Sequence, residues 1–183
     1  LGMKGSRFEV SVEPQTDPEG INVDKLGKVR LGPGGADEIE FLLSTIPDRP
    51  LRPLRDVASG GEISRIMLAL KYVLGKAHTV PTMIFDEIDL GIGGKTGDIV
   101  AERLQDLSKE KQVICITHLP QIAARAERNL RVTKTESRGT QKTTVEYLSG
   151  KDREDEMVRM LGADEASRKY ARELLRGPKG KRK

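Results

Sequence analysis

The segment SGGEISRIMLALKYVLGKAHTVPTMIFDE, from Ser59 to Glu87, decides which fold this sequence can adopt. It begins with a serine and two glycines, continues with apolar residues at helical spacing, turns at Pro81 and ends in a short apolar run before two acids. Apolar residues that recur every three or four positions indicate a helix, and a four-residue apolar run indicates a buried strand. The segment therefore predicts a buried helix followed by a strand over residues 82–85.

The amino end of this helix is a candidate anion site. Ser59 is a favoured N-cap residue, and Gly60 and Gly61 have no Cβ to cover the free N–H groups of the first turn. The positive end of the helix dipole favours a phosphate oxygen at this position. A capped core helix after a glycine turn explains the same residues without a ligand, so the four residues up to Glu62 leave both interpretations open.

Two neighbouring acids, Asp86 and Glu87, end the predicted strand. Adjacent side chains on a strand point to opposite faces, so the two carboxylates cannot do the same work. One can hold Mg²⁺ through water, and the other can orient or deprotonate an attacking water molecule. Acids at the end of a strand are also often the first polar residues of a loop, and an isolated Asp-Glu pair would favour that alternative.

A second buried strand is predicted over residues 112–117, after an amphipathic helix that includes residues 99–107. The order strand, helix, strand implies a right-handed parallel crossover, which brings both carboxyl ends to one edge of the sheet. His118 directly follows the second strand, so we expect it near the acid pair, where ligands bind open α/β sheets. It can donate a hydrogen bond to a terminal phosphate, or it can simply precede the next helix as part of its cap.

The loop after the acids is rich in glycine and contains Gly94-Lys95-Thr96, which imitates the end of a P-loop. The motif G-x-x-x-x-G-K-[ST] requires glycine at position 89, where this chain has Asp89, so we reject a P-loop there and find no other match. Asp89 is either an ordinary loop acid or a polar contact across an interface.

The rest of the chain predicts a mixed α/β lobe. Alternating residues predict half-buried strands at 7–12, within 21–31 and at 39–46, with a turn-rich connection at 14–20 and an extended, proline-containing segment from 47 to Ser59. Further along, the pattern predicts a hairpin over 130–134 and 143–148 and helices over 154–161 and 166–175. We therefore expect one lobe over residues 1–175: strands and linker in 1–58, a parallel-strand core in 59–128, and a hairpin and helices in 129–175.

Composition limits the function classes. Five of the 32 basic residues lie in residues 176–183, which contain no acid, so the remaining chain has 27 basic against 28 acidic residues. We expect this basic tail to be disordered and able to contact a phosphate backbone weakly. The single cysteine, Cys115, lies in an apolar run and is expected to be a buried hydrophobe. Without a long apolar run or a signal-peptide pattern, the chain is expected to be soluble and intracellular.

Several of these motifs resemble those of ABC-type ATPases. Ser59 to Glu62 resembles their signature motif, Met83 to Glu87 their Walker B segment, Asp89 their D-loop and His118 their switch histidine. The longer strings VASGGEISR (57–65), FDEIDLGIGG (85–94) and THLPQIA (117–123) are similar to those of the RecN family, bacterial ATPases of double-strand-break repair related to SMC proteins. The resemblance extends from near residue 1 to about residue 175.

The resemblance implies an ATPase head that dimerises around ATP and Mg²⁺. In that family, the signature of one protomer closes on the γ-phosphate held by the partner's P-loop. The implied residues for nucleotide binding are Ser59, Gly60, Gly61, Glu62 and Asp89, the last coupling the two composite sites. Asp86 would support Mg²⁺, Glu87 would activate the hydrolytic water, and His118 would sense the γ-phosphate. ATP binding would clamp two heads, and coiled-coil arms would act on DNA.

One departure from the family pattern concerns the P-loop and the coiled-coil heptads, neither of which we find in this sequence. In the family, the P-loop half of the head and the coiled coil precede the segment seen here, so we expect the C-terminal half of an ABC/SMC-type head. Its partners would be the N-terminal P-loop half, a second protomer and DNA, in the cytoplasm and without a membrane. We expect no ATP turnover by this lobe alone. The alternatives are a nucleotide-binding lobe of an ABC transporter, or a non-catalytic DNA-binding module that acts through the basic tail.

Overall fold

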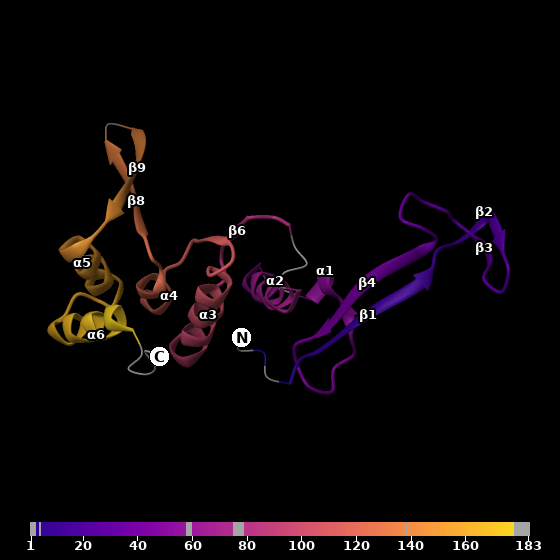
Figure 1. Cartoon of the computed structure of the whole chain (residues 1–183), viewed down its shortest axis with the longest axis horizontal. Helices are drawn as coiled ribbons and strands as arrows, with labels where there is room; N and C mark the ends of the chain where they lie inside the picture. Colours follow the sequence, from indigo (N-terminus) through magenta and orange to yellow (C-terminus); the bar gives the residue numbers. More distant parts are fainter. Residues whose placement is uncertain (1–2, 4, 58–59, 75–78, 138, 178–183) are drawn as a thin grey trace. The chain divides into compact units, whose positions relative to one another are not determined.

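The computed structural model describes residue 3 and residues 5–57, 60–74, 79–137 and 139–177 of the 183-residue chain. It divides into two compact units, with residues 2–59 in the first and residues 60–183 in the second. Figure 1 shows the elements of both units. Each unit is described separately.

The N-terminal unit is mainly antiparallel β-structure. Its elements are β1 (Arg7–Pro14), β2 (Thr16–Val23), β3 (Gly27–Val29), β4 (Asp37–Ser44), β5 (Arg52–Pro53) and α1 (Leu54–Val57). Strand β4 lies between β1 and β5 in one antiparallel sheet, and β2 pairs with β3 in another. Phe8 stacks on Phe41 across the β1–β4 pair, with ring centroids 5.7 Å apart. The predicted N-terminal antiparallel strands are therefore present.

Two connections in this unit differ from the prediction. Residues 14–20, predicted as a turn-rich connection, include the start of β2, whose register with β3 shifts once. Gly20 permits this close pairing, because a Cβ there would lie 2.2 Å from the carbonyl oxygen of Val29. The segment between Pro47 and Ser59, predicted to be extended, contains β5 and the short helix α1. Its prolines precede the helix instead of interrupting it.

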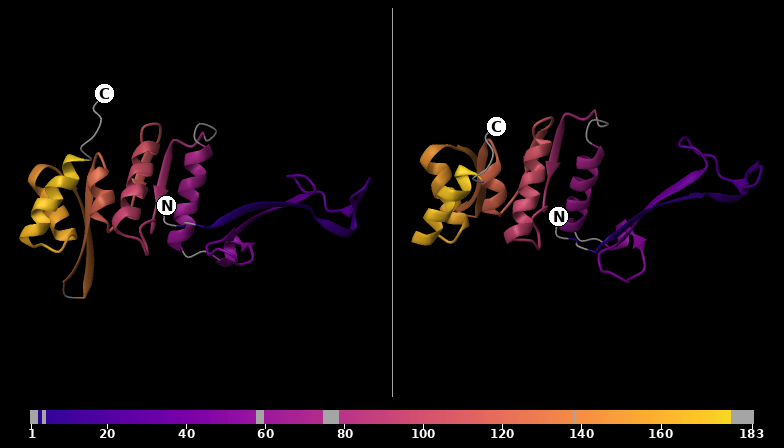
Figure 2. Two further views of the ribbon diagram at one scale, coloured as in Figure 1. Left: turned by 90° about the horizontal axis from the view of Figure 1, so that it is seen from below. Right: turned by 60° about the horizontal axis from the view of Figure 1, so that its bottom comes forward.

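The C-terminal unit begins with an α/β core. Its elements are α2 (Gly60–Leu74), β6 (Thr82–Phe85), α3 (Gly94–Leu107) and β7 (Gln112–Cys115). Strands β6 and β7 pair in parallel, with Phe85 opposite Cys115. Figure 2 shows α2 and α3 side by side, and both contribute to the core cluster under β6. That cluster contains Leu68, Met83, Phe85, Ile88, Val100, Ala101, Leu104, Leu107 and Ile122. The predicted parallel crossover is confirmed.

The end of the chain forms a second packed group. Its elements are α4 (Pro120–Arg125), β8 (Asn129–Ser137), β9 (Thr140–Leu148), α5 (Gly150–Met160) and α6 (Glu165–Arg176). A small apolar cluster holds the three helices α4, α5 and α6 together. It contains Ala123, Ala124, Met157, Val158 and Ala171. The hairpin is longer than predicted, since pairing continues to Ser137 opposite Thr140. Most of the predicted basic tail, residues 178–183, lies outside the described residues. Among the described helices, none has the length and apolar character that crossing a bilayer requires.

Candidate functional site

The carboxyl ends of β6 and β7 form the edge where the sequence predicted a site. Because the two strands are parallel and paired through Phe85 and Cys115, both chains leave the sheet on the same side. The backbone N–H of Ile116 donates to the carbonyl oxygen of Phe85 at 2.9 Å, which continues the pairing beyond the strands. Asp86 follows β6 directly, and His118 lies three residues after β7. The structure thus brings both loops to one edge.

The two acids have different backbone conformations and are both exposed. Glu87 has a φ of 56°, in the left-handed region, so the chain turns sharply directly after the strand. Its backbone N–H donates to Oδ1 of Asp86 at 2.9 Å, and the hydroxyl of Ser64 donates to the carbonyl oxygen of Asp86 at 2.8 Å. The acid pair is therefore held against the first turns of α2.

The glycines at the start of α2 allow this close approach. A Cβ on Gly61 would lie 2.9 Å from the carbonyl oxygen of Glu87 and 3.0 Å from that of Leu90. A Cβ on Gly60 would lie 2.5 Å from Oε2 of Glu87. Gly60 and Gly61 thus lie against the acid loop of their own chain, and the sequence alone did not predict this contact. Glu62 is half-buried in the same first turn, while Ser59 lies outside the described residues.

Arg65 is a site residue that the sequence analysis missed. Its side chain is buried, and Nη1 donates to the carbonyl oxygens of Ile88 at 3.3 Å and Leu90 at 2.9 Å. Burial lowers the pKa of this guanidinium, an effect that the Glu62 carboxylate opposes. The sequence carried a signal, since a cation four residues after Gly61 falls on the buried face of the helix. Arg65 ties α2 to the loop that follows the acids.

Asp89 joins the two loops at the sheet edge. Its side chain is almost fully buried, and Oδ2 accepts hydrogen bonds from the Thr117 hydroxyl at 2.5 Å and from the backbone N–H groups of His118 at 2.7 Å and Leu119 at 3.2 Å. The Nδ1 atom of His118 lies 3.0 Å from the same oxygen, while 67% of the His118 side chain remains exposed. The carboxylate of Asp89 is thus directed into its own chain, and its role across an interface stays a prediction.

Cys115 is half-buried and packs against the core, so it is less enclosed than the sequence predicted. Burial raises the pKa of its thiol to about 12, and the negative charges of Asp89 and Asp86 act in the same direction. A thiol that keeps its proton at neutral pH is a poor nucleophile. The site chemistry therefore rests on carboxylates and an imidazole.

The donor set fits Mg²⁺ only in part. Within the described residues, no three histidine, cysteine or acidic side chains gather as a metal cage. Asp86 offers an exposed carboxylate at the sheet edge, and Mg²⁺ is commonly held by one or two carboxylates together with water and substrate phosphates. Asp86 therefore suits a Mg²⁺ that arrives with a phosphate ligand.

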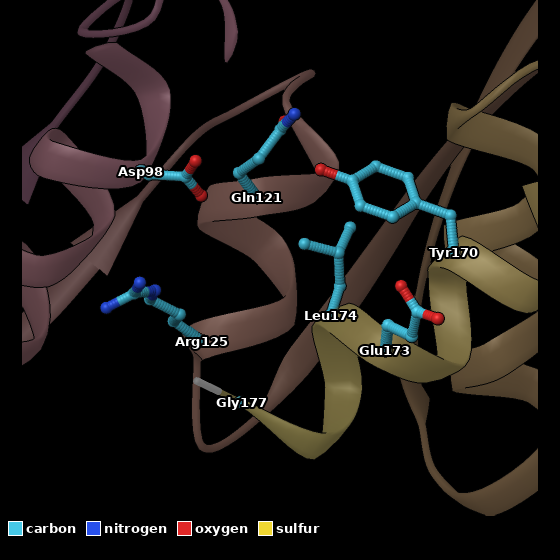
Figure 3. A pocket seen from close by; sticks show the side chains of 7 residues that line it. All are labelled: Asp98, Gln121, Arg125, Tyr170, Glu173, Leu174 and Gly177. Carbon is cyan, nitrogen blue, oxygen red and sulfur yellow. The ribbon is translucent and has the colours of Figure 1, made fainter. Parts of the chain in front are cut away.

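A separate hollow of about 380 Å³ lies among α3, α4 and α6 (Figure 3). Asp98 comes from α3 and Arg125 from α4, and Tyr170 points into it from α6. The predicted site residues are not among those that line it. The sheet edge, with its convergent polar groups, remains the candidate site.

This architecture places the chain among the α/β ATPase heads of the ABC/SMC type. The family model described as "RecF/RecN/SMC N terminal domain" matches residues 21–141. The chain belongs to this RecF/RecN/SMC family, as the sequence motifs predicted.

Named relatives narrow the comparison within the family. The chain is 46% identical over 179 residues to the DNA repair protein RecN of Treponema pallidum (strain Nichols), covering 96% of this chain and 30% of that protein. It is 43% identical over 179 residues to the DNA repair protein RecN of Streptomyces coelicolor, covering 96% of this chain and 31% of that protein. The chain therefore spans about a third of the length of these relatives.

A solved structure supports the fold. An Smc head domain with a coiled coil and joint, derived from Pyrococcus yayanosii, superposes with a TM-score of 0.53 at 21% identity. The match covers 84% of this chain and 25% of that one. At this identity the likeness concerns the fold alone.

Proposed function

We propose that this chain is the C-terminal lobe of the ATPase head of an SMC-like protein that acts in DNA double-strand-break repair. In the complete protein, ATP binding joins two heads and hydrolysis releases them. The observation that supports this proposal is the common edge of β6 and β7, where Asp89, in the loop after the acid pair, bonds to the histidine loop beside the start of α2. The resemblance to RecN proteins suggests that the residues at this edge act on a bound nucleotide.

The start of α2 binds nucleotide held by a partner head. Gly60 and Gly61, with Ser59 and Glu62, face the γ-phosphate of an ATP molecule whose other phosphates lie in the partner's P-loop. Backbone N–H groups at a helix start suit an anionic oxygen, and the dipole of a 15-residue helix favours negative charge there. The site is composite, so the chain alone does not turn over ATP.

The two acids at the sheet edge, Asp86 and Glu87, have different roles in hydrolysis. Asp86 holds Mg²⁺, which neutralises charge on the phosphates when it is bound. Glu87 adopts a left-handed backbone conformation directly after the strand. It orients the attacking water and takes its proton. His118 contacts the γ-phosphate from the neighbouring loop, and Asp89 couples the two composite sites through its hydrogen bonds to that loop.

The exposed face of the parallel strands favours an N-terminal P-loop half as a partner. Parallel sheets are normally covered on both faces, yet Ile84, Ile114 and Ile116 are exposed on the face opposite the core. A further strand or helix from the P-loop half would bury these side chains. The assembled protein would be a homodimer that engages DNA at the nucleoid, in the cytoplasm.

Replacing Glu87 by glutamine in the complete protein tests the proposed base. The Glu87→Gln variant should keep ATP-dependent dimerisation, because the amide preserves the shape of the side chain. Its kcat should fall by about 100-fold or more, since an amide cannot accept the proton of the attacking water. Phosphate release and analytical ultracentrifugation measure the two properties. Glu102→Gln, an exposed change on α3, is the matched control. Unchanged turnover in Glu87→Gln would contradict the assignment.

A further inference from the structure

One buried carboxylate organises the entire histidine loop. Oδ2 of Asp89 accepts from one hydroxyl and two backbone N–H groups, and it also faces Nδ1 of His118. Burying a carboxylate is costly unless hydrogen bonds replace its water. All four of these donors come from the consecutive residues Thr117, His118 and Leu119. The buried charge is thus stabilised by the loop that it holds.

We propose that Asp89 is a positioning residue for His118: it fixes the imidazole with Nδ1 inward and Nε2 outward. This inference rests on the proposed function, which gives His118 its contact with the γ-phosphate. Asp89 itself reaches no ligand directly, because only 3% of its side chain is exposed. Its contribution to turnover passes through the orientation of the ring.

The short distance between Nδ1 and the carboxylate, 3.0 Å, also limits the tautomer of the ring. A carboxylate only accepts hydrogen bonds, so Nδ1 must carry the proton that lies between His118 and Asp89. In a neutral ring, Nε2 then has a lone pair and accepts a hydrogen bond. When the ring carries two protons, Nε2 donates instead, and the Asp89 carboxylate balances its charge. Asp89 thereby leaves Nε2 as the nitrogen that faces outward, and Nε2 can donate to a phosphate oxygen only when it carries a proton.

The hydrogen bonds of the loop give a second restraint on His118. The Thr117 hydroxyl donates to Asp89 and accepts from the Leu119 N–H at 3.0 Å, so the backbone around His118 is held on both sides. The loop and the ring are therefore fixed by the same oxygen. Removing the carboxylate should loosen both, whereas an amide in its place should keep an acceptor without the charge.

Nitrogen NMR of the histidine rings tests the geometry without any need for activity. The chain has only two histidines, so ¹⁵N-histidine labelling and a His78→Gln variant assign the signal of His118. We expect the Nδ1–H tautomer in the unchanged chain, a mixture of tautomers in Asp89→Ala, and no change in the control Asp106→Ala on α3. An Nε2–H tautomer in the unchanged chain would overturn the proposal, and this measurement remains available if Asp89→Ala does not fold.

A double-mutant cycle in the complete protein tests the functional part. Asp89→Asn should lower kcat by about 10–100-fold, the usual size for residues that orient a reacting group, with little change in KM. In a His118→Ala background, the same change should have no further effect. Equal losses in both backgrounds would show that Asp89 does not act through His118. If the complete protein did not hydrolyse ATP at all, the proposed function would fail, while the tautomer result would still decide the geometry.

Discussion

At the scale of single residues, Arg65 has a structural role that its sequence context gave little reason to expect. It lies inside the molecule and donates to two carbonyl oxygens of the loop after the acids. Arg65→Met should lower the free energy of unfolding by about 2–4 kcal/mol, because it removes charged hydrogen bonds and leaves buried carbonyl groups without a donor. Urea unfolding measures the loss.

The matched control for Arg65 is an exposed arginine. Arg168 pairs with Asp155 at 3.4 Å on the surface of the helical group, and 48% of its side chain is exposed. Arg168→Met should cost less than about 1 kcal/mol, since exposed ion pairs contribute little. Equal effects at both positions would mean that Arg65 does not anchor the loop.

Cys115 provides a pH-dependent test at the same scale. Its pKa is raised to about 12, so the thiolate is almost absent at pH 8. A free cysteine, with a pKa of about 8.5, is partly ionised at the same pH. Alkylation by iodoacetamide should be slow in the native chain at pH 8 and become fast in urea. Because the chain has one cysteine, mass spectrometry reports this site alone. Rapid native labelling would contradict the raised pKa of this thiol.

Some of these residues could be predicted and others could not. Asp86 and Glu87 directly follow β6, and His118 lies three residues after β7, so a parallel crossover is enough to bring them to one edge. The bonds of Asp89 could not be predicted, because they join residues 28 to 30 positions apart and depend on side-chain direction inside a loop. Hydrophobic periodicity carries no information about such contacts.

At the scale of elements, the contact between α2 and the acid loop depends on a missing side chain. A Cβ on Gly61 would press on backbone atoms of Glu87 and Leu90, which cannot move without shifting the loop. Gly61→Ala should therefore destabilise the chain by about 1–3 kcal/mol, as overpacking does. Thermal unfolding of the chain measures it.

Two other glycines provide the comparison. Gly34 has no neighbour within 4 Å of an added Cβ, so Gly34→Ala should leave stability nearly unchanged. At Gly60 the obstructing atom is the flexible end of Glu87, which can rotate away, so Gly60→Ala should cost less than Gly61→Ala. A larger loss at Gly60 would contradict this account of the helix start.

The elements themselves were predictable where one pattern dominated. The strand over 82–85 and the hairpin near the end of the chain follow from apolar runs and a glycine-containing loop. The first part of β2 was missed because it contains Pro18 and Gly20, which normally indicate a turn, and because β2 pairs through a shifted register. In this segment, backbone pairing with β3 outweighs the turn propensity of the local sequence.

At the scale of the whole molecule, the exposed face of β6 and β7 allows a test of the proposed P-loop half of the head. A substitution on this face should affect stability differently in the 183-residue chain and in the complete protein. Ile84 is 68% exposed in this chain, so Ile84→Ser should change the stability of the 183-residue chain by only about 0.5 kcal/mol. In the complete protein, where the P-loop half is proposed to cover this face, the same change should cost about 1.5–3 kcal/mol. Met83, the preceding residue on the buried face, is the control, and Met83→Ser should be costly in both forms. Denaturant unfolding of both forms gives the comparison, and an equal, small effect of Ile84→Ser in each would show that no second half of the head packs on these strands.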